Sequence, residues 1–312
     1  MPDAFATPTP GGLPVTAPPL LFALPGHEEA ARRLAGHEVH EPGRLQVDRF
    51  PEGESRVRLL TPVEGRAVDL FCSLARPEPQ LAPLLLAAGA ARDQGATRVR
   101  LVSPYLPYLR QDTAFAPGEG VSARIFARWL SAWFDEVVTV DPHLHRIASL
   151  AELFTIPARA VASAPLVARW IAVHVDRPLV VGPDAESRQW AGAVAKALDA
   201  PLLMMRKRRH GLRAVEVEPE EAPPPGFRPV LVDDIAGTGG TLAAAARALD
   251  ALGLAAPVAV VVHALIGPDD LARLEGSLAR LVSTDSVAHP SNAIALAPAL
   301  AAALAEPAAS EA

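Results

Sequence analysis

The sequence predicts an α/β protein made of two doubly wound parallel-sheet domains of similar fold. The chain has 312 residues, of which 50% are hydrophobic, which is enough for two separate cores. Short apolar runs rich in β-branched residues alternate with longer segments of helical period. The runs are almost continuously apolar, as strands are when helices cover both faces of their sheet.

The expected elements follow one another regularly. In the first half, we expect strands and helices in turn at residues 20–24, 68–74, 83–94, 99–102, 122–134 and 137–140. In the second half, we expect them at residues 164–174, 179–181, 186–198, 202–205, 230–232, 242–252, 258–262, 269–278 and 281–282. The alternation lapses between Asp141 and Pro165, so the chain is expected to cross between domains there. The expected division is a leader at 1–18, domains at 19–150 and 151–290, and a C-terminal segment at 291–312.

Composition narrows the class of function. The formal net charge of -6 gives no overall basic field, so we expect small ligands rather than nucleic acid as partners. The single cysteine, Cys72, excludes an internal disulfide framework and a Cys-rich zinc site, which fits a reducing, cytoplasmic location. No uncharged apolar run reaches the roughly 18–20 residues that span a bilayer, so no membrane segment is expected. The proline-rich residues 1–18 lack Lys and Arg, which predicts a disordered leader rather than a secretory signal.

The most specific motif is VDDIAGTGGT, which runs from Val232 to Thr241. An apolar strand delivers Asp233 and Asp234, and a Thr-Gly-Gly-Thr turn then opens an Ala-rich helix. Glycines let backbone amides approach an anion, and the helix N-terminus favours phosphate. The motif therefore predicts a phosphate-binding turn, with the two carboxylates contacting ribose hydroxyls or hydrated magnesium. The structural alternative is an ordinary strand-turn-helix connection with an acidic cap.

This segment resembles the ribose 5-phosphate-binding loop shared by type I phosphoribosyltransferases and ribose-phosphate pyrophosphokinases. Further segments favour the second family, also called PRPP synthetases, and they follow in the family's order. These segments are DRFPEGESRVRL, SPYLPYLRQD, VDPHLHR, VVGPDAES and MRKRRHG. The resemblance implies two phosphoribosyltransferase-like domains, and it implies that STDSVAHPSNAI leads into a C-terminal helix that returns to the N-terminal domain.

The resemblance also implies roles for individual residues. The sugar phosphate would bind at Asp233, Asp234, Thr238, Gly239, Gly240 and Thr241. ATP would bind at Phe50, Glu52, Glu54, Arg110 and Gln111, with the first three holding adenine across a subunit boundary. Magnesium would bind near His143 and Asp184, and the catalytic cations would be Lys207 and Arg209. Taken alone, Phe50 is equally well explained as a hairpin core residue, and a basic run such as MRKRRHG is usually a solvated face.

The chain departs from the family's pattern at several of these segments. Gly237 stands where many members have a third Asp, and Ala185, Glu186 and Ser187 replace glycines that follow the "PD" pair. Thr113 stands where a basic residue often follows "RQD".

The implied reaction transfers the diphosphate of ATP to the anomeric hydroxyl of ribose 5-phosphate, giving PRPP and AMP, with Mg²⁺ as cofactor. A homo-oligomer is implied, with neither nucleic acid nor membrane as a partner. Two alternatives remain open. One is a phosphoribosyltransferase that consumes PRPP, and the other is a non-catalytic regulatory homologue.

Overall fold

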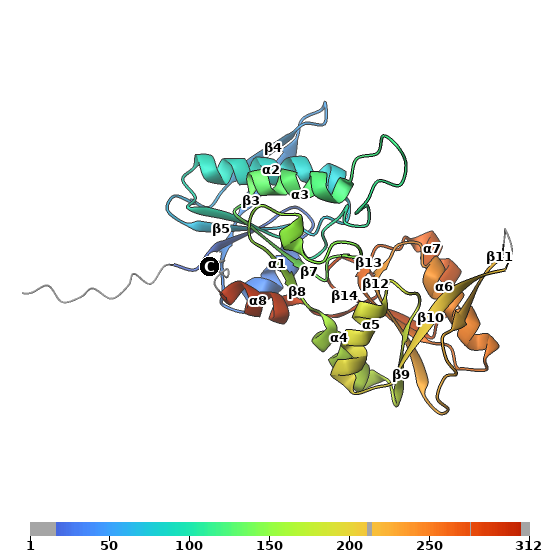
Figure 1. The fold of residues 1–312 in the computed structure, drawn as a ribbon. Coiled ribbons are helices and arrows are strands. Elements are labelled where there is room, and N and C mark those ends of the chain that lie inside the picture. Colours follow the sequence, from blue (N-terminus) through green and yellow to red (C-terminus); the bar gives the residue numbers. More distant parts are fainter. Residues whose placement is uncertain (1–16, 211–213, 275, 307–312) are drawn as a thin grey trace, which may run out of the picture.

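The computed structural model describes residues 17–210, 214–274 and 276–306, without the side chains of residues 207–216. Two mainly parallel sheets with helices on both faces are present, so the α/β prediction is confirmed (Figure 1). Nearly all of the leader expected at residues 1–18 lies outside the described residues. Within the described part of the chain, no helix combines the length and the apolar character needed to cross a bilayer.

The first sheet has six parallel strands in the order β2-β1-β5-β6-β7-β8. Their bounds are β1 (Leu20–Ala23), β2 (Glu41–Gly43), β5 (Ala67–Phe71), β6 (Arg98–Val102), β7 (Glu136–Val140) and β8 (Ala158–Val161). One face packs against α2 (Pro77–Asp93) and α3 (Ser122–Trp133), and the other against α1 (Glu28–Ala35) and α8 (Ala297–Ala305) (Figure 1). The last helix of the chain thus lies on the first sheet, where Leu300 and Leu304 share a buried cluster with Leu34.

A separate antiparallel hairpin joins β3 (Leu45–Arg49) to β4 (Ser55–Leu59). Figure 1 shows it projecting from the first domain beside α2, with its tip away from α1 and α8. The tip carries Phe50, whose side chain is 44% exposed. The partly buried Val47 and Val57 pack on the first core, so one face of the hairpin is attached to the domain while the tip extends into solvent.

The second sheet has seven strands in the order β11-β10-β9-β12-β13-β14-β15, and only the β10–β11 pair is antiparallel. Their bounds are β9 (Pro178–Gly182), β10 (Leu202–His210), β11 (Ala214–Pro219), β12 (Arg228–Ala236), β13 (Val258–Ala264), β14 (Arg280–Thr284) and β15 (Asn292–Ile294). Helices α4 (Ala164–His174) and α5 (Arg188–Leu198) cover one face, and α6 (Gly240–Ala251) covers the other. The short α7 (Pro268–Leu274) connects β13 to β14.

The two sheets share one winding pattern. In each, the first strand of the domain, β1 or β9, lies inside the sheet, with the next parallel strand on one side and the later strands on the other. Ligands of open α/β sheets gather at the carboxyl ends of the strands beside such a reversal. In the second sheet the reversal lies between β9 and β12, the strands that lead to Asp184 and to Asp233.

The crossing between the domains occurs between β8 and α4. Strand β8 pairs with β7, and a short 3₁₀ turn at Leu150–Glu152 precedes it. The first sheet therefore extends to Val161, past the division expected after residue 150, while the crossing falls inside the expected interval from Asp141 to Pro165. The sequence does not reveal β8 because its four residues, ARAV, have no long apolar run.

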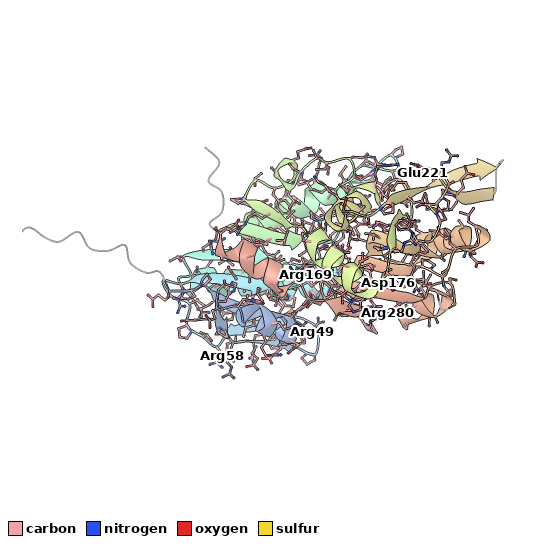
Figure 2. The ribbon with its side chains drawn as sticks, turned by 90° about the horizontal axis from the view of Figure 1, so that it is seen from below. Arg49, Arg58, Arg169, Asp176, Glu221 and Arg280 are labelled. Atoms are coloured by element: carbon pink, nitrogen blue, oxygen red, sulfur yellow. The ribbon has the colours of Figure 1, made fainter. Side chains whose placement is uncertain are left out.

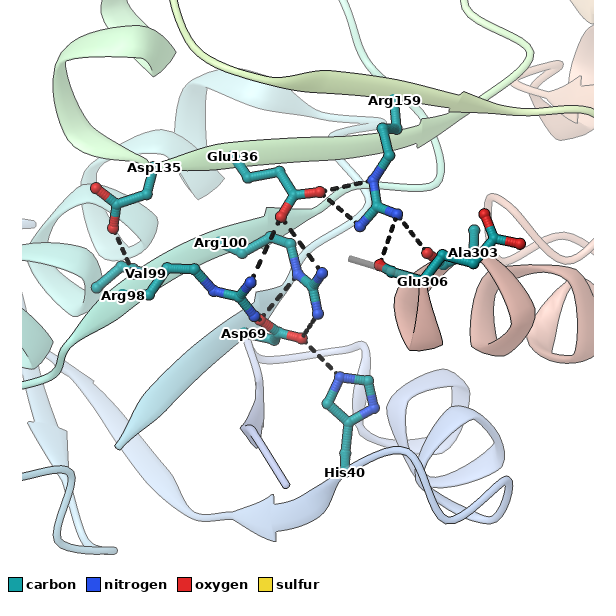
Figure 3. A network of polar contacts seen from close by, with 10 residues as sticks. All are labelled: His40, Asp69, Arg98, Val99, Arg100, Asp135, Glu136, Arg159, Ala303 and Glu306. Atoms are coloured by element: carbon teal, nitrogen blue, oxygen red, sulfur yellow. Dashed lines mark hydrogen bonds and ion pairs between the residues drawn. The ribbon is translucent and has the colours of Figure 1, made fainter. Parts of the chain in front are cut away.

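A buried ladder of charged side chains lies across the first sheet, on the face covered by α1 and α8 (Figure 3). Strand register places Asp69 beside Arg100, and Arg100 beside Glu136. Arg100 Nε donates to Asp69 Oδ1 at 3.0 Å, and His40 contacts Asp69 Oδ2 at 2.6 Å. Arg159 donates to Glu136 Oε1 at 2.6 Å and also to the carbonyl of Ala303 at 2.5 Å. The ladder thereby attaches the C-terminal end of α8 to the sheet.

The outer surface carries charges of both signs on both domains. Figure 2 labels Arg49 and Arg58 on the hairpin strands of the first domain, and Glu221 and Arg280 on the second, all of them exposed. This mixture agrees with the modest net charge of the sequence.

Candidate active site

The turn after β12 has the form that the motif predicted. Strand β12 ends at Ala236, and α6 begins at Gly240, whose amide donates to Thr238 Oγ1 at 3.5 Å, while the N-cap residue Gly239 provides no side-chain cap. Gly239 has a φ of 72°, and a Cβ at this position would lie 2.7 Å from Leu274 and 2.9 Å from Ile266. Only glycine satisfies both the conformation and the space, so the amides of the first turn of α6 remain accessible to an anion.

Three carboxylates belong to this end of the second sheet. Asp234 is only 3% exposed, and its backbone amide donates to Asp233 Oδ1 at 3.0 Å. Burial, followed by the negative charges of Asp234 and Asp184, raises the pKa of Asp233 well above its usual value. Such a concentration of buried negative charge favours a cation or hydroxyl donors at this place.

Asp184 follows β9 and is partly engaged in its own loop. Its Oδ1 accepts hydrogen bonds from the amides of Glu186 at 3.1 Å and Ser187 at 3.2 Å. The Ser187 hydroxyl donates to the Asp184 carbonyl at 2.7 Å, and this bond closes the loop. The residues that replace the family's glycines therefore form a compact turn that fixes the carboxylate of Asp184.

His143 joins the two domains. It follows β7 of the first domain, and its Nδ1 lies 2.6 Å from Asp234 Oδ2 of the second. Burial lowers the pKa of His143, but the hydrogen bond and charge of Asp234 outweigh this effect, and the net shift is upward. A carboxylate at Nδ1 fixes Nδ1 as the donor and leaves Nε2 for a ligand.

Arg110 also reaches across the domains. Its Nη1 lies 3.6 Å from the place that a Cβ on Gly237 would take, directly at the phosphate-binding turn. No hydrogen bond or ion pair engages its side chain among the residues that the structure describes. The guanidinium is therefore available to an anionic ligand at this turn.

Gln111 is turned toward its own segment. Its Oε1 accepts from the Ser122 hydroxyl, and its Nε2 lies 3.5 Å from Glu119 Oε2. Phe50, Glu52 and Glu54 lie at the exposed hairpin tip. Within the described residues, no hydrogen bond or ion pair connects that tip with Arg110 or Gln111. One copy of the chain thus brings together the sugar-phosphate residues, His143 and Arg110, but not the whole predicted ATP set.

Lys207 and Arg209 lie on β10, and their side chains are outside the described residues. Register nevertheless places this part of the backbone. Met204 pairs with Gly182 of β9, and Val181 of β9 pairs with Leu231 of β12. Lys207 follows Met204 by three residues and therefore lies past the carboxyl end of β9, the strand that leads to Asp184.

Several residues at this junction were not assigned roles from the sequence. Asp112 accepts hydrogen bonds from the backbone amide of Arg146 at 3.0 Å and from its Nη1 at 2.7 Å. Buried His263 contacts the carbonyl of Val140 across the domain boundary at 3.1 Å. Asp112 stands in the "RQD" segment, which is a usable signal, whereas nothing in the sequence indicates the contact of His263.

Two further observations restrict the chemistry. Among the described residues, no group of three or more His, Cys, Asp or Glu side chains forms a ready metal site. Burial raises the pKa of the Cys72 thiol to about 12, so Cys72 is no candidate for a nucleophile.

Comparison with known proteins identifies the family. The model for the N-terminal domain of ribose phosphate pyrophosphokinase matches residues 20–133, and that for the phosphoribosyl transferase domain matches residues 152–304. The ribose-phosphate pyrophosphokinase of Methanopyrus kandleri is 35% identical over 86% of this chain and 92% of that protein. The Halobacterium salinarum protein of the same name is 33% identical over 91% of this chain and its whole length.

A solved structure gives the same result. The crystal structure of phosphoribosylpyrophosphate synthetase from Mycobacterium smegmatis has a TM-score of 0.80 at 25% identity, covering 92% of this chain and 98% of that one. The two matched domains and these relatives agree with the segments from which the resemblance was drawn. The chain therefore belongs to the ribose-phosphate pyrophosphokinase family.

Proposed function

We propose that this protein transfers the β,γ-diphosphate of ATP to the anomeric hydroxyl of ribose 5-phosphate, giving PRPP and AMP. The observation that supports this best is the 2.6 Å contact between His143 and Asp234, because it joins a loop of the first domain to the sugar-phosphate turn of the second. A phosphoribosyltransferase that consumes PRPP would need the turn but would leave the "RFPEGE", "RQD" and "VDPH" segments without a role.

The sugar phosphate would bind at the end of β12. Asp233 and Asp234 would accept hydrogen bonds from ribose hydroxyls, which would add donors for Asp233 to the backbone amide of Asp234. The 5-phosphate would bind at the start of α6, to the backbone amides of Thr238, Gly239, Gly240 and Thr241 and to the hydroxyls of the two threonines.

ATP would bind between two copies of the chain. Arg110 would supply a planar cation for its phosphates. The side chain of Gln111 contacts Ser122 and Glu119, so it would have to release both before it could bind ATP. We expect residues 113–120 to move when this happens. Phe50, Glu52 and Glu54 would hold adenine from the hairpin of the second copy, so the active form would be a homo-oligomer.

Magnesium would enter with ATP rather than occupy a site made by protein alone. Mg²⁺ usually keeps several waters and is bound through one or two carboxylates together with substrate phosphates. The described residues fit this arrangement, because no group of three or more His, Cys, Asp or Glu side chains gathers among them, so phosphate oxygens and water would have to complete the coordination. His143 and Asp184 would hold the ion together with phosphate oxygens. When bound, the ion neutralises phosphate charge.

The transfer itself needs alignment and charge neutralisation more than covalent chemistry. The anomeric oxygen forms a bond to the β-phosphorus and releases its proton to solvent, while the bond from the β-phosphorus to the bridging oxygen breaks and AMP leaves with that oxygen. Lys207 and Arg209 would stabilise the charge that grows on that bridging oxygen and on the β-phosphate.

The surroundings of the enzyme are also part of the proposal. The single buried Cys72 and the net charge of -6 support a cytoplasmic enzyme without nucleic acid or membrane partners. After gentle lysis and fractionation, we expect the protein to be absent from the membrane fraction and from the nucleic acid fraction.

An assay of AMP release tests the proposed reaction. Protein mixed with ATP, Mg²⁺ and ribose 5-phosphate should release AMP, and omission of the sugar phosphate should abolish the release. Absence of AMP together with PRPP-dependent nucleotide formation would favour the phosphoribosyltransferase. Absence of both would favour a regulatory homologue. Running the assay with several nucleoside triphosphates establishes the preferred donor.

A further inference from the structure

His143 has an aromatic neighbour that the proposed reaction does not account for. The indole of Trp190, in the first turns of α5, stacks on the imidazole of His143 with ring centroids 5.8 Å apart and planes inclined by 19°. Trp190 is 9% exposed, so the indole covers one face of the imidazole. The two residues come from different domains and are 47 positions apart in the sequence.

The stack and the hydrogen bond to Asp234 together determine the orientation of the imidazole. Asp234 engages Nδ1 at 2.6 Å, and the indole restricts rotation of the ring about its bond to Cβ. Within the described residues, Nε2 of His143 has no hydrogen-bond partner. The ring is therefore held with Nε2 open to a ligand.

The loop that carries His143 is held in the same place by α5 and by the "RQD" segment. Gln189, next to Trp190, donates from Nε2 to the carbonyl of Leu144 at 3.1 Å. Asp112 binds Arg146 at the other end of the loop. These contacts hold the backbone of the loop, whereas the orientation of the His143 ring depends on Asp234 and on Trp190, and only Trp190 covers a face of the ring.

We propose that Trp190 is a positioning residue that acts through His143 and holds its Nε2 toward the metal-bound phosphates of ATP. The proposal rests on the proposed function, since it assumes that His143 faces ATP. It predicts an effect on turnover and on ATP that is larger than any effect on the sugar phosphate, because among the described residues no hydrogen bond, ion pair or ring contact joins Trp190 directly to the sugar-phosphate residues.

The chain contains a matched control. Trp170 stacks on His174 with centroids 4.1 Å apart and planes inclined by 9°, within the single helix α4. His174 is exposed, and its Nδ1 lies 2.7 Å from the carbonyl oxygen of Trp170 in the same helix. Removing this indole deletes a comparable Trp–His stack that has no connection with His143.

The experiment compares Trp190→Leu, Trp190→Phe and Trp170→Leu for kcat, for KM with each substrate and for melting temperature. Trp190→Leu is expected to lower kcat/KM for ATP about three- to tenfold, as expected for the loss of one aromatic stack. Ribose 5-phosphate affinity by calorimetry should stay within about twofold of wild type. Trp190→Phe should recover most of the loss, because a ring remains, and Trp170→Leu should match wild type in kinetics.

A double-mutant cycle decides whether Trp190 acts through His143. In a His143→Ala background, Trp190→Leu should change kcat/KM by less than about twofold. A full effect of Trp190→Leu in that background, or equal kinetics of the Trp190→Leu and Trp170→Leu proteins, would overturn the proposal.

Calorimetry with Mg²⁺ and ATP measures nucleotide binding without turnover, so it tests the role of Trp190 independently of the proposed reaction. Weaker binding by Trp190→Leu alone supports the stack even if the wild type proves to release no AMP, whereas unchanged binding in that case counts against it.

Discussion

Asp233 and Asp234 are neighbours in sequence but meet different surroundings. Asp234 receives His143 Nδ1, which gives its carboxylate a fixed direction. Burial and the charges of Asp234 and Asp184 raise the pKa of Asp233, and hydroxyl donors or a cation at this carboxyl group would act in the opposite direction. Asp234 is therefore an acceptor whose orientation is fixed in the free protein, whereas Asp233 is an acceptor whose ionised form ligand binding would stabilise.

The catalytic assignment of Lys207 gives a prediction at this scale. Lys207→Ala should lower kcat by about a hundredfold or more while changing ribose 5-phosphate affinity little, because the charge that it would stabilise grows toward the transition state. Steady-state kinetics and calorimetry check the two quantities. The control is Lys196→Ala, because Lys196 is the only other lysine and is exposed on α5. Near wild-type turnover of the Lys207 variant would refute the assignment.

The positions of single site residues could be predicted from the sequence where the residues belong to a local motif. Contacts between segments far apart in the sequence could not be predicted. The turn with Asp233, Asp234 and Gly239 was predicted as a phosphate-binding turn, and the structure shows an uncapped helix start there. The contact of Trp190 with His143 depends on the packing of two domains, which no local pattern reports. The same holds for the approach of Arg110 to Gly237.

At the scale of elements, the first sheet contains charges where its strands look apolar. Asp69, Arg100 and Glu136 lie on adjacent strands inside the face covered by α1 and α8, where Arg100 pairs with both carboxylates and Arg159 also pairs with Glu136 (Figure 3). Desolvation of Asp69 is offset by its hydrogen bonds from His40 and Arg100, and its pKa is lowered. Since buried charges are tolerated only with partners, the ladder constrains strand register and the position of α8.

Removal of one member of the ladder tests this view. Arg100→Met should destabilise the fold by about 3–5 kcal/mol, because Asp69 and Glu136 would remain buried with too few cations. Chemical denaturation provides the free energy of unfolding. The exposed pair of Arg56 and Asp48 offers a control, since Arg56→Met should cost less than about 1 kcal/mol. Equal effects of the two changes would mean that the ladder contributes no more than a surface pair.

The strands that carry long apolar runs were predicted, whereas the short edge elements were not. Strand β2 has the sequence EPG and β15 the sequence NAI, and neither shows a strand period. They form because they complete the edge of a sheet that already exists. Helix α7 ends at Leu274, before the expected end at residue 278.

At the scale of the whole molecule, the domains meet through buried polar contacts as well as through α8. His263 of β13 contacts the Val140 carbonyl through Nε2 and the Ser286 hydroxyl through Nδ1, at 3.1 and 2.9 Å. The Ser73 hydroxyl of the first domain donates to the carbonyl of Ser286 at 2.5 Å. These contacts hold the carboxyl ends of the two sheets against each other, where the substrates would meet.

The buried imidazole of His263 predicts a pH dependence of stability. Burial lowers the pKa of His263 from 6.5 to about 4. The unfolded chain therefore binds a proton at higher pH than the folded one, and stability falls as the pH drops from about 6.5 to about 4, by about 3 kcal/mol in total. Urea unfolding at pH 7 and pH 5 should show a smaller difference for His263→Gln than for wild type. An unchanged difference would exclude His263 as a cause.

The homo-oligomer can be tested by mixing inactive variants. On the proposed roles, Phe50→Ala would impair the part of the site that a partner copy supplies, and Lys207→Ala would impair the part that stays within the second domain. If two copies share each site, co-refolded mixtures should regain turnover that neither variant has alone. Activity equal to the sum of the separate variants would mean that each chain contains a complete site.

The central claim is that the two sheet edges face each other so that a diphosphate passes directly from ATP to the sugar. ³¹P NMR of the complete reaction tests this most directly, because it distinguishes all phosphorus products. The account predicts that AMP and PRPP appear together in equal amounts, only when ribose 5-phosphate is present. Formation of ADP with a sugar bisphosphate, or AMP without PRPP, would contradict it.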